Sequence, residues 1–230
     1  MGIEEELVPR VIFAVGPVEV TSTVVTTWLV MAFLVITSYL IGRNLKVRPG
    51  ALQNILEWIV ESIDGLLKNM IGPGSRILLP FIGTLSIFIV AANLAGLLPG
   101  LKAPTTDINT PLALALIVFF AVHYYGIKRQ GLREHLADYL RPIFLMLPIH
   151  LVSELARTIS LTVRLFGNMM GEEIVVSILF LVLPLIVPVP MMIFGIFTGF
   201  IQAYVFTILT ITYLAGAVKA EGAREQQTAK

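Results

Sequence analysis

Polar and charged side chains recur on one face of the segment His150–Glu173, at the spacing of an α-helix. The intervals between them are three, four, three, four, four and three residues, which at 3.6 residues per turn predicts a single polar stripe. The members of this stripe are His150, Ser153, Arg157, Ser160, Arg164, Asn168 and Gly171. Most residues between them are Leu, Ile, Val, Phe or Met, as expected of a helix in lipid.

Arg164 lies near the middle of the stripe, with apolar sequence on both sides. An arginine at membrane depth costs roughly +2.5 to +3.5 kcal/mol on insertion scales, and its guanidinium group cannot escape this cost by losing a proton. Ionisable residues at this depth usually serve ion pathways or proton relays. We therefore interpret Arg164 as a fixed cation that keeps a mobile carboxylate ionised. For Arg157, a structural ion pair or a side chain reaching the interface is the alternative.

Three carboxylates accompany the stripe. Glu154 and Glu172 flank it, and Glu173 lies about 100° from Glu172 around the helix and points roughly to the other side. One of the two adjacent glutamates can line an aqueous cleft while the other faces a partner helix. The alternative for either is a carboxylate at a helix end among solvated headgroups.

Two amides and two histidines lie elsewhere in apolar sequence. Gln202 can pair with a guanidinium or a carboxylate across a helix interface, or it can only join two helices, and Asn93 has the same two interpretations. His150 is either a proton relay or a hydrogen-bonding residue between helices. His123, beside two tyrosines, is typical of a residue at the membrane interface.

The elements that must position these residues are membrane helices. The 230 residues are 57% hydrophobic and 13% charged, with a mean hydropathy of +0.88, whereas soluble domains carry about 25% charged residues. The sequence contains no cysteine, which excludes disulfides, and its three isolated histidines argue against a metal site. We expect no cofactor, and the lack of a basic cluster argues against nucleic acid. The first 21 residues lack a basic n-region, so we expect them to be retained rather than cleaved.

Three uncharged segments are expected to cross the membrane: Thr23–Ile41, Ile77–Leu101 and Pro111–Ile127. Basic residues follow the first segment (Arg43, Lys46, Arg48) and the third (within Lys128–Arg141), which predicts that these ends face the cytoplasm and that the N-terminus lies outside.

The segment Ala51–Met70 has apolar residues at steps of three or four. This pattern predicts an amphipathic helix on the cytoplasmic surface, with a soluble packed helix as the alternative.

The segment Ile174–Val218 has no charge over 45 residues. As one helix it would be about 68 Å long, more than twice the thickness of the hydrocarbon core. Because Pro184, Pro188 and Pro190 interrupt it, we expect two long helices joined near Leu183–Pro190 and strongly tilted.

The predicted fold class is an all-α polytopic membrane protein, with about five membrane-embedded helices plus one amphipathic surface helix. Its single integral membrane domain, residues 1–230, divides into an external segment (1–22), the surface helix (51–70), two long tilted helices (142–217) and a flexible cytoplasmic tail (218–230).

Three motifs resemble subunit a of the F-type rotary ATP synthases. These are RLFGNM at Arg164–Met169 followed by Glu173, IQAYVF at Ile201–Phe206 followed by LTITYL, and NLAGLLPG at Asn93–Gly100. The resemblance covers about Val24 to Ala217, and the predicted order of helices is similar to that of the family.

This resemblance implies a stator in the membrane sector, which forms two offset aqueous half-channels that carry protons or sodium ions to and from a ring of c-subunits. Its partners would be that ring, b-type peripheral stalk subunits and lipid. The membrane would be a bacterial inner (plasma) membrane, with the N-terminus outside and the C-terminus in the cytoplasm. ATP chemistry would belong to other subunits, and the chain has no Walker-type phosphate loop.

The resemblance also implies roles for single residues. Arg164 matches the family's essential arginine, which separates the half-channels and keeps the facing ring carboxylate ionised. Asn168, Glu173 and Gln202 match residues that line a half-channel or neighbour the arginine. Asn93 matches a polar residue near the outer channel.

One position departs from the pattern. Some members carry a histidine seven residues before the glutamine, where this chain has Gly195. We hypothesise that Glu172 compensates, and we favour Glu173 as the residue that handles the ion. His150, Ser153, Glu154, Arg157 and Ser160 are accessory candidates.

Two other functions compete with the stator. A secondary ion transporter with an arginine–carboxylate gate would work alone, without a ring. An intramembrane enzyme would need a Ser/His, Cys/His or metal-ligand constellation, which the sequence lacks.

Overall fold

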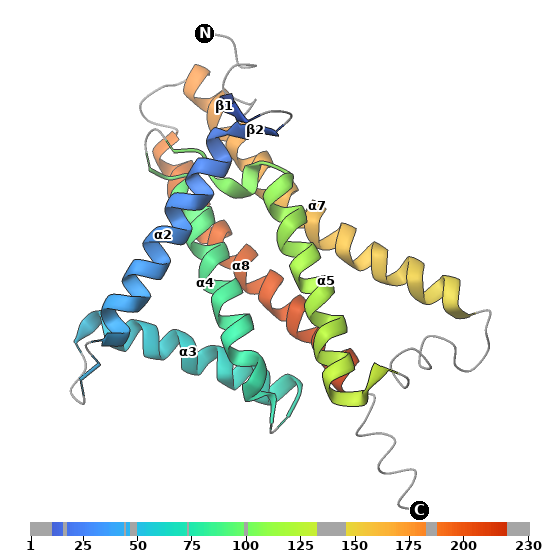
Figure 1. The fold of residues 1–230 in the computed structure, drawn as a ribbon. Coiled ribbons are helices and arrows are strands. Elements are labelled where there is room, and N and C mark those ends of the chain that lie inside the picture. Colours follow the sequence, from blue (N-terminus) through green and yellow to red (C-terminus); the bar gives the residue numbers. More distant parts are fainter. Residues whose placement is uncertain are drawn as a thin grey trace, which may run out of the picture.

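The computed structural model describes residues 11–15, 18–43, 45–46, 50–72, 74–98, 101–132, 146–182 and 188–219. Over these residues the chain is a bundle of long helices with a short β-hairpin at one end (Figure 1). In chain order the long helices are α2 (Ser22–Arg43), α3 (Ala51–Met70), α4 (Leu79–Ala95), α5 (Asn109–Gln130), α7 (Met146–Val182) and α8 (Pro188–Lys219). The 3-10 helix η1 (Ser75–Leu78) precedes α4, and η2 (Pro104–Thr106) precedes α5.

The predicted fold class is confirmed: the protein is an all-α polytopic membrane protein. Among the described residues, four helices are long and apolar enough to cross a bilayer, and they lie at Ser22–Arg43, Ser75–Ala95, Asn109–Lys128 and Val189–Gly216. The 37-residue α7 is not among them, because it carries the five charged residues noted above. How strongly α7 and α8 tilt in a membrane stays a prediction.

The predicted helix boundaries hold best where the pattern is strongest. α3 begins and ends at the expected residues, Ala51 and Met70. The second apolar segment, expected to continue to Leu101, ends its helix at Ala95. The chain turns there because Gly96 lies against Ala103, so closely that a Cβ at Gly96 would be 2.7 Å from the Ala103 Cβ.

Two short strands were missing from the prediction. β1 (Val11–Val15) pairs antiparallel with β2 (Val18–Thr21), directly before α2. The sequence predicted only an external segment for this stretch, because strands of five and four residues leave little periodicity to detect.

Prolines begin the last helix rather than interrupt it. Pro188 and Pro190 both lie in the first turn of α8, where proline removes no intrahelical hydrogen bond. The predicted junction near Leu183–Pro190 therefore shortens to residues 183–187, which lie outside the described residues, as does Pro184. The same holds for the first ten residues, most of the basic segment after Leu132, and the tail after Lys219.

Two buried clusters hold the helices together. One joins α4, α5, α7 and α8, and its fully buried members include Ile89, Leu165 and Phe206. The other joins α3 and α4 to the C-terminal part of α8 through Leu67, Ile82 and Leu214. In Figure 1, α7 and α8 run obliquely across α4 and α5, and α3 lies at the end of the bundle opposite to the hairpin.

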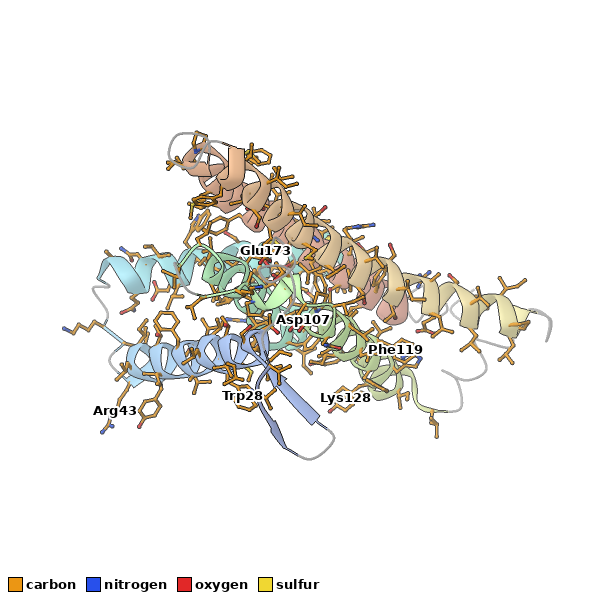
Figure 2. All side chains as sticks on the ribbon, turned by 90° about the horizontal axis from the view of Figure 1, so that it is seen from above. Trp28, Arg43, Asp107, Phe119, Lys128 and Glu173 are labelled. Carbon is orange, nitrogen blue, oxygen red and sulfur yellow. The ribbon has the colours of Figure 1, made fainter. Side chains whose placement is uncertain are left out.

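The hairpin end is tied to the loop before α5 by a buried carboxylate. Asp107 accepts a hydrogen bond from Thr23 Oγ1 at 2.7 Å and two more from the backbone nitrogen and side chain of Asn109. Figure 2 shows Asp107 inside the bundle, whereas Trp28 and Arg43 lie on the outer side of α2. This tie fixes the loop that forms one wall of the cavity described next.

Candidate functional site

The predicted polar stripe lies on an exposed face of α7. All seven of its members are exposed in this chain, Arg164 and Asn168 included. The opposite face of the same helix is buried through Leu161, Leu165 and Met169, which belong to the main core. The helix therefore packs with its apolar face inward and leaves its arginine on a surface that nothing in the described chain covers.

A cavity of about 180 Å³ opens beside the C-terminal half of α7. We call it the carboxylate cavity, because both Glu172 and Glu173 line it; Figure 2 shows Glu173 near the middle of the bundle. Its other polar lining residues are Asn93 of α4 and Lys102 and Thr106 of the loop before α5. The two glutamates thus share one space, and Glu172 also faces a partner helix, because its carboxylate contacts α8. The cavity has room for several waters.

The space that a side chain at position 195 would fill is occupied by another side chain. A Cβ built on Gly195 would overlap the Glu172 carboxylate, with Oε1 as its nearest atom. The other carboxylate oxygen, Oε2, accepts a hydrogen bond from Thr198 Oγ1 at 2.7 Å. The Glu172 carboxylate of α7 therefore occupies space on α8 that only glycine at position 195 leaves free.

Asn168 and Gln202 join α7 to α8 close to the arginine in sequence. Asn168 Nδ2 donates to Gln202 Oε1 at 2.6 Å, so the glutamine pairs with an amide rather than with a guanidinium or carboxylate. Gln202 is 3% exposed, and its Nε2 atom has no hydrogen-bond partner in the described part of the chain. A buried donor without an acceptor is uncommon and is most often found at functional positions or beside water.

Asn93 connects α4 to α8 and to the cavity wall. Its Nδ2 atom donates to the Gly199 carbonyl at 3.0 Å, and its Oδ1 atom accepts from Thr105 Oγ1 at 2.9 Å. Gly199 permits this contact, since a Cβ there would be 3.3 Å from the Asn93 Cβ. Two glycines of α8, four residues apart, therefore admit two different neighbours, Glu172 at Gly195 and Asn93 at Gly199.

The N-terminal half of α7 has its own carboxylate, facing another way. Glu154 Oε1 lies 3.4 Å from His123 Nε2 of α5, and the guanidinium carbon of Arg157 lies 5.6 Å from the Tyr213 ring centroid on α8. The remaining accessory candidates, His150, Ser153 and Ser160, are exposed along the stripe.

Sequence reasoning missed four residues that the structure brings to these places. Thr198 donates a hydrogen bond to Glu172, and Thr105 donates one to Asn93. Lys102 lines the carboxylate cavity, and His123, which was predicted only to lie at the membrane interface, contacts Glu154. No motif marked them, because each depends on how two helices or a loop and a helix meet. Among the described residues, no group of three or more His, Cys, Asp or Glu side chains could hold a metal ion.

Comparison with known proteins identifies the family. The family model described as ATP synthase A chain matches residues 24–215. The chain is 46% identical to ATP synthase subunit a 2 of a Bradyrhizobium species over 212 residues, which is 92% of this chain and 95% of that protein. It is 43% identical to ATP synthase subunit a of Moorella thermoacetica over 210 residues, covering 91% and 96% of the two chains. The chain belongs to the family of ATP synthase subunit a, as an integral membrane protein of that complex.

Proposed function

We propose that this chain is the stator that couples ion flow to rotation of a c-ring, and that Arg164 separates two ion paths. One observation supports this most strongly. Arg164 is exposed at the middle of a polar face, and α7 carries acidic residues on both sides of it along the helix. The face that is open in this chain fits a partner that brings its own carboxylates.

The first path is the carboxylate cavity. With the N-terminus outside, as the basic residues after α2 favour, the cavity opens toward the outer side of the membrane. Glu173 transfers the ion to the ring carboxylate. Glu172, which fills the space beside Gly195, assists this transfer. The ordered carboxylate of Glu172, held by Thr198, thus takes the place of the histidine that other members carry.

The second path follows the stripe from Arg164 toward His150, on the cytoplasmic side. This chain forms only one wall of it, since the stripe is exposed along its whole length. The ring supplies the opposite wall. Ions therefore cannot pass directly from one path to the other without meeting the guanidinium group of Arg164.

The role of Arg164 follows from electrostatics. A ring carboxylate that has bound its ion is neutral and can face lipid, whereas an ionised carboxylate cannot do so without a cation nearby. At 4 Å and an effective dielectric constant of about 20, the attraction between the two charges is about 4 kcal/mol. Each charge moved across the membrane yields about 2.3 kcal/mol per 100 mV, so several charges per turn can supply ATP synthesis.

Two measurements test this function. Purification of the chain from its native membrane should recover a small proteolipid with a membrane-embedded carboxylate; recovery of a functional transporter without it would favour a stand-alone carrier. ATP-driven pumping by the assembled complex in vesicles, with and without sodium, then identifies the ion. Pumping that needs no sodium and acidifies the lumen indicates protons, and pumping that requires sodium indicates sodium.

The assignment of the two glutamates is tested by separate substitutions. We expect Glu173→Gln to abolish pumping and Glu172→Gln to reduce it. Unchanged pumping in Glu172→Gln, together with complete loss in Glu173→Gln, would exclude the compensating role of Glu172.

A further inference from the structure

A second titratable pair lies outside the carboxylate cavity, between α5 and α7. His123 Nε2 and Glu154 Oε1 are 3.4 Å apart, and the two side chains are only 28% and 14% exposed. Neither residue lines the carboxylate cavity. The two residues lie on different helices, and no pattern in the sequence predicts their contact.

Its hydrogen-bond geometry indicates which nitrogen of His123 carries a proton and what the contact with Glu154 requires. His123 Nδ1 lies 2.9 Å from the Phe119 carbonyl oxygen, which can only accept, so Nδ1 carries a proton. In a neutral imidazole the other nitrogen, Nε2, is then an acceptor. It faces a carboxylate oxygen, which is also an acceptor when ionised. The contact is therefore attractive only when one further proton is present, either on Nε2 or on the Glu154 carboxyl group.

The surroundings suit a proton that enters and leaves. A small cavity of about 20 Å³ has Glu154, Arg157, Thr158 and Tyr213 in its lining, together with apolar residues of α5 and α7, and a space of this size holds about one water. The charged and titratable groups in this lining are Glu154, Arg157 of α7 and Tyr213 of α8. On α5, Tyr124, Tyr125 and Lys128 follow His123, with the Lys128 Nζ atom 5.8 Å from the Tyr124 ring centroid.

The pair lies on the other side of Arg164 from the carboxylate cavity. Glu154 precedes Arg164 by ten residues, about 15 Å along the helix axis, whereas Glu173 follows it by nine, about 14 Å. Arg157, which shares the small cavity with Glu154, belongs to the exposed stripe. The pair thus borders the second path of the proposed function.

We infer that His123 and Glu154 form a proton-holding pair through which protons pass between the cytoplasmic solution and the ring-facing stripe. This inference rests on the proposed function. In the loaded state the pair shares one proton between Nε2 and Oε1. Release to water breaks one N–H or O–H bond and leaves a neutral imidazole, protonated on Nδ1, beside an ionised carboxylate. The accepting water gains one O–H bond and becomes hydronium, and no other bond changes.

The test measures passive proton flux through the membrane sector, in vesicles made from the whole complex and then stripped of its catalytic sector. The variants are Glu154→Gln, His123→Gln and the double variant. The double variant keeps a hydrogen bond between two amides but cannot hold a titratable proton. Glu61→Gln, an exposed carboxylate on α3, is the matched control. Pumping and ATP hydrolysis of the unstripped complex verify assembly.

We expect Glu154→Gln to lower passive flux about tenfold, which corresponds to about 1.4 kcal/mol of barrier. The double variant should stay as low as the single one. In both, the dependence of flux on the cytoplasmic-side pH should flatten. The dependence on the opposite-side pH should persist, and Glu61→Gln should match the wild type.

Wild-type flux and pH dependence in Glu154→Gln would overturn the inference. So would full recovery in the double variant, because the pair would then be only a tie between two helices. The Arg164→Ala variant separates this result from the proposed function. If coupled pumping survives in Arg164→Ala, the stator proposal fails whatever the pair does, whereas an inert pair leaves that proposal standing.

Discussion

The two halves of α7 on either side of Arg164 are built in different ways. After Arg164, the helix is packed into its own chain: Asn168 bonds to Gln202, Glu172 bonds to Thr198, and both glutamates line one cavity. Before Arg164, the stripe is exposed, while Glu154 turns inward toward His123 and the Arg157 guanidinium group lies near the Tyr213 ring. One half encloses its polar groups, and the other half leaves them on a surface.

This difference separates what the chain can do alone from what needs a partner. Polar groups enclosed by one chain are positioned by that chain, so their removal changes both its stability and its activity. Groups on an open face contribute little to the stability of the isolated chain, and under the proposed function their effect appears only when the ring covers them. Substitutions in the two halves of α7, or in residues packed against them, should therefore behave differently, and four tests follow in order of decreasing effect.

The largest expected effect is that of Glu173→Gln in the enclosed half. We expect ATP-driven pumping to fall at least about hundredfold, the lower end of what a positioned acid–base group contributes. The complex should still assemble, because glutamine keeps the size of the side chain. Vesicle acidification is the measurement, with Glu61→Gln as the control. Pumping within twofold of the wild type would show that Glu173 is not part of the ion path.

The second effect concerns the close contact between α7 and α8. In Gly195→Ala, the new Cβ must displace the Glu172 carboxylate and break its bond to Thr198, so we expect pumping to fall about tenfold, or about 1.4 kcal/mol. Adding Glu172→Ser should restore the packing of the helices but not the pumping. Gly83→Ala on α4, where a Cβ would meet no atom within 4 Å, is the matched control. If the Gly195→Ala variant pumps as well as the Gly83→Ala variant, the contact between Glu172 and Gly195 does not contribute to pumping.

The third effect is on stability. Asn93→Leu removes the two buried hydrogen bonds to Gly199 and Thr105, and we expect it to cost about 1 to 3 kcal/mol. A lower thermal unfolding temperature of the detergent-solubilised chain would report this. Thr84→Val removes one bond to a backbone carbonyl at an exposed position and should change stability by less than about 0.5 kcal/mol. Equal unfolding temperatures for the two variants would contradict the claim that the hydrogen bonds of Asn93 stabilise the chain.

The smallest effects are expected in the open half. Ser153→Ala and Ser160→Ala should leave the unfolding temperature of the isolated chain unchanged, since both residues are exposed. In the assembled complex we expect pumping to fall about threefold or less, the value of one modest hydrogen bond of about 0.6 kcal/mol. A clear loss of stability in the isolated chain would show that the stripe is not an open face.

Patterns within one helix could be predicted, whereas contacts between helices could not. The polar stripe from His150 to Gly171 and the bounds of α3 both follow from the 3.6-residue period of a single helix. The contacts of Glu172 with Gly195 and of Glu154 with His123 depend on how pairs of helices cross, which spacing along one helix does not determine.

The same limit explains the errors near the ends of elements. α4 stops at Ala95 because its next residue meets a loop residue, Ala103, and the apolar sequence itself continues. The division of the apolar run near Leu183–Pro190, by contrast, was predicted correctly, since α7 ends at Val182 and α8 begins at Pro188, and proline is well tolerated in a first turn. The family motifs identified Arg164, Glu173 and Gln202, but they could not place the two glutamates in one cavity.

The most direct test of the central claim compares Arg164→Ala with Arg157→Ala in the assembled complex. Both arginines are exposed on the same stripe, two helical turns apart, so the pair controls for charge and for position on the ring-facing surface. ATP-driven pumping in vesicles is the measurement, with ATP hydrolysis as the check on assembly. The account predicts that Arg164→Ala loses coupled pumping entirely while Arg157→Ala keeps most of it. Coupled pumping that survives in Arg164→Ala would contradict it.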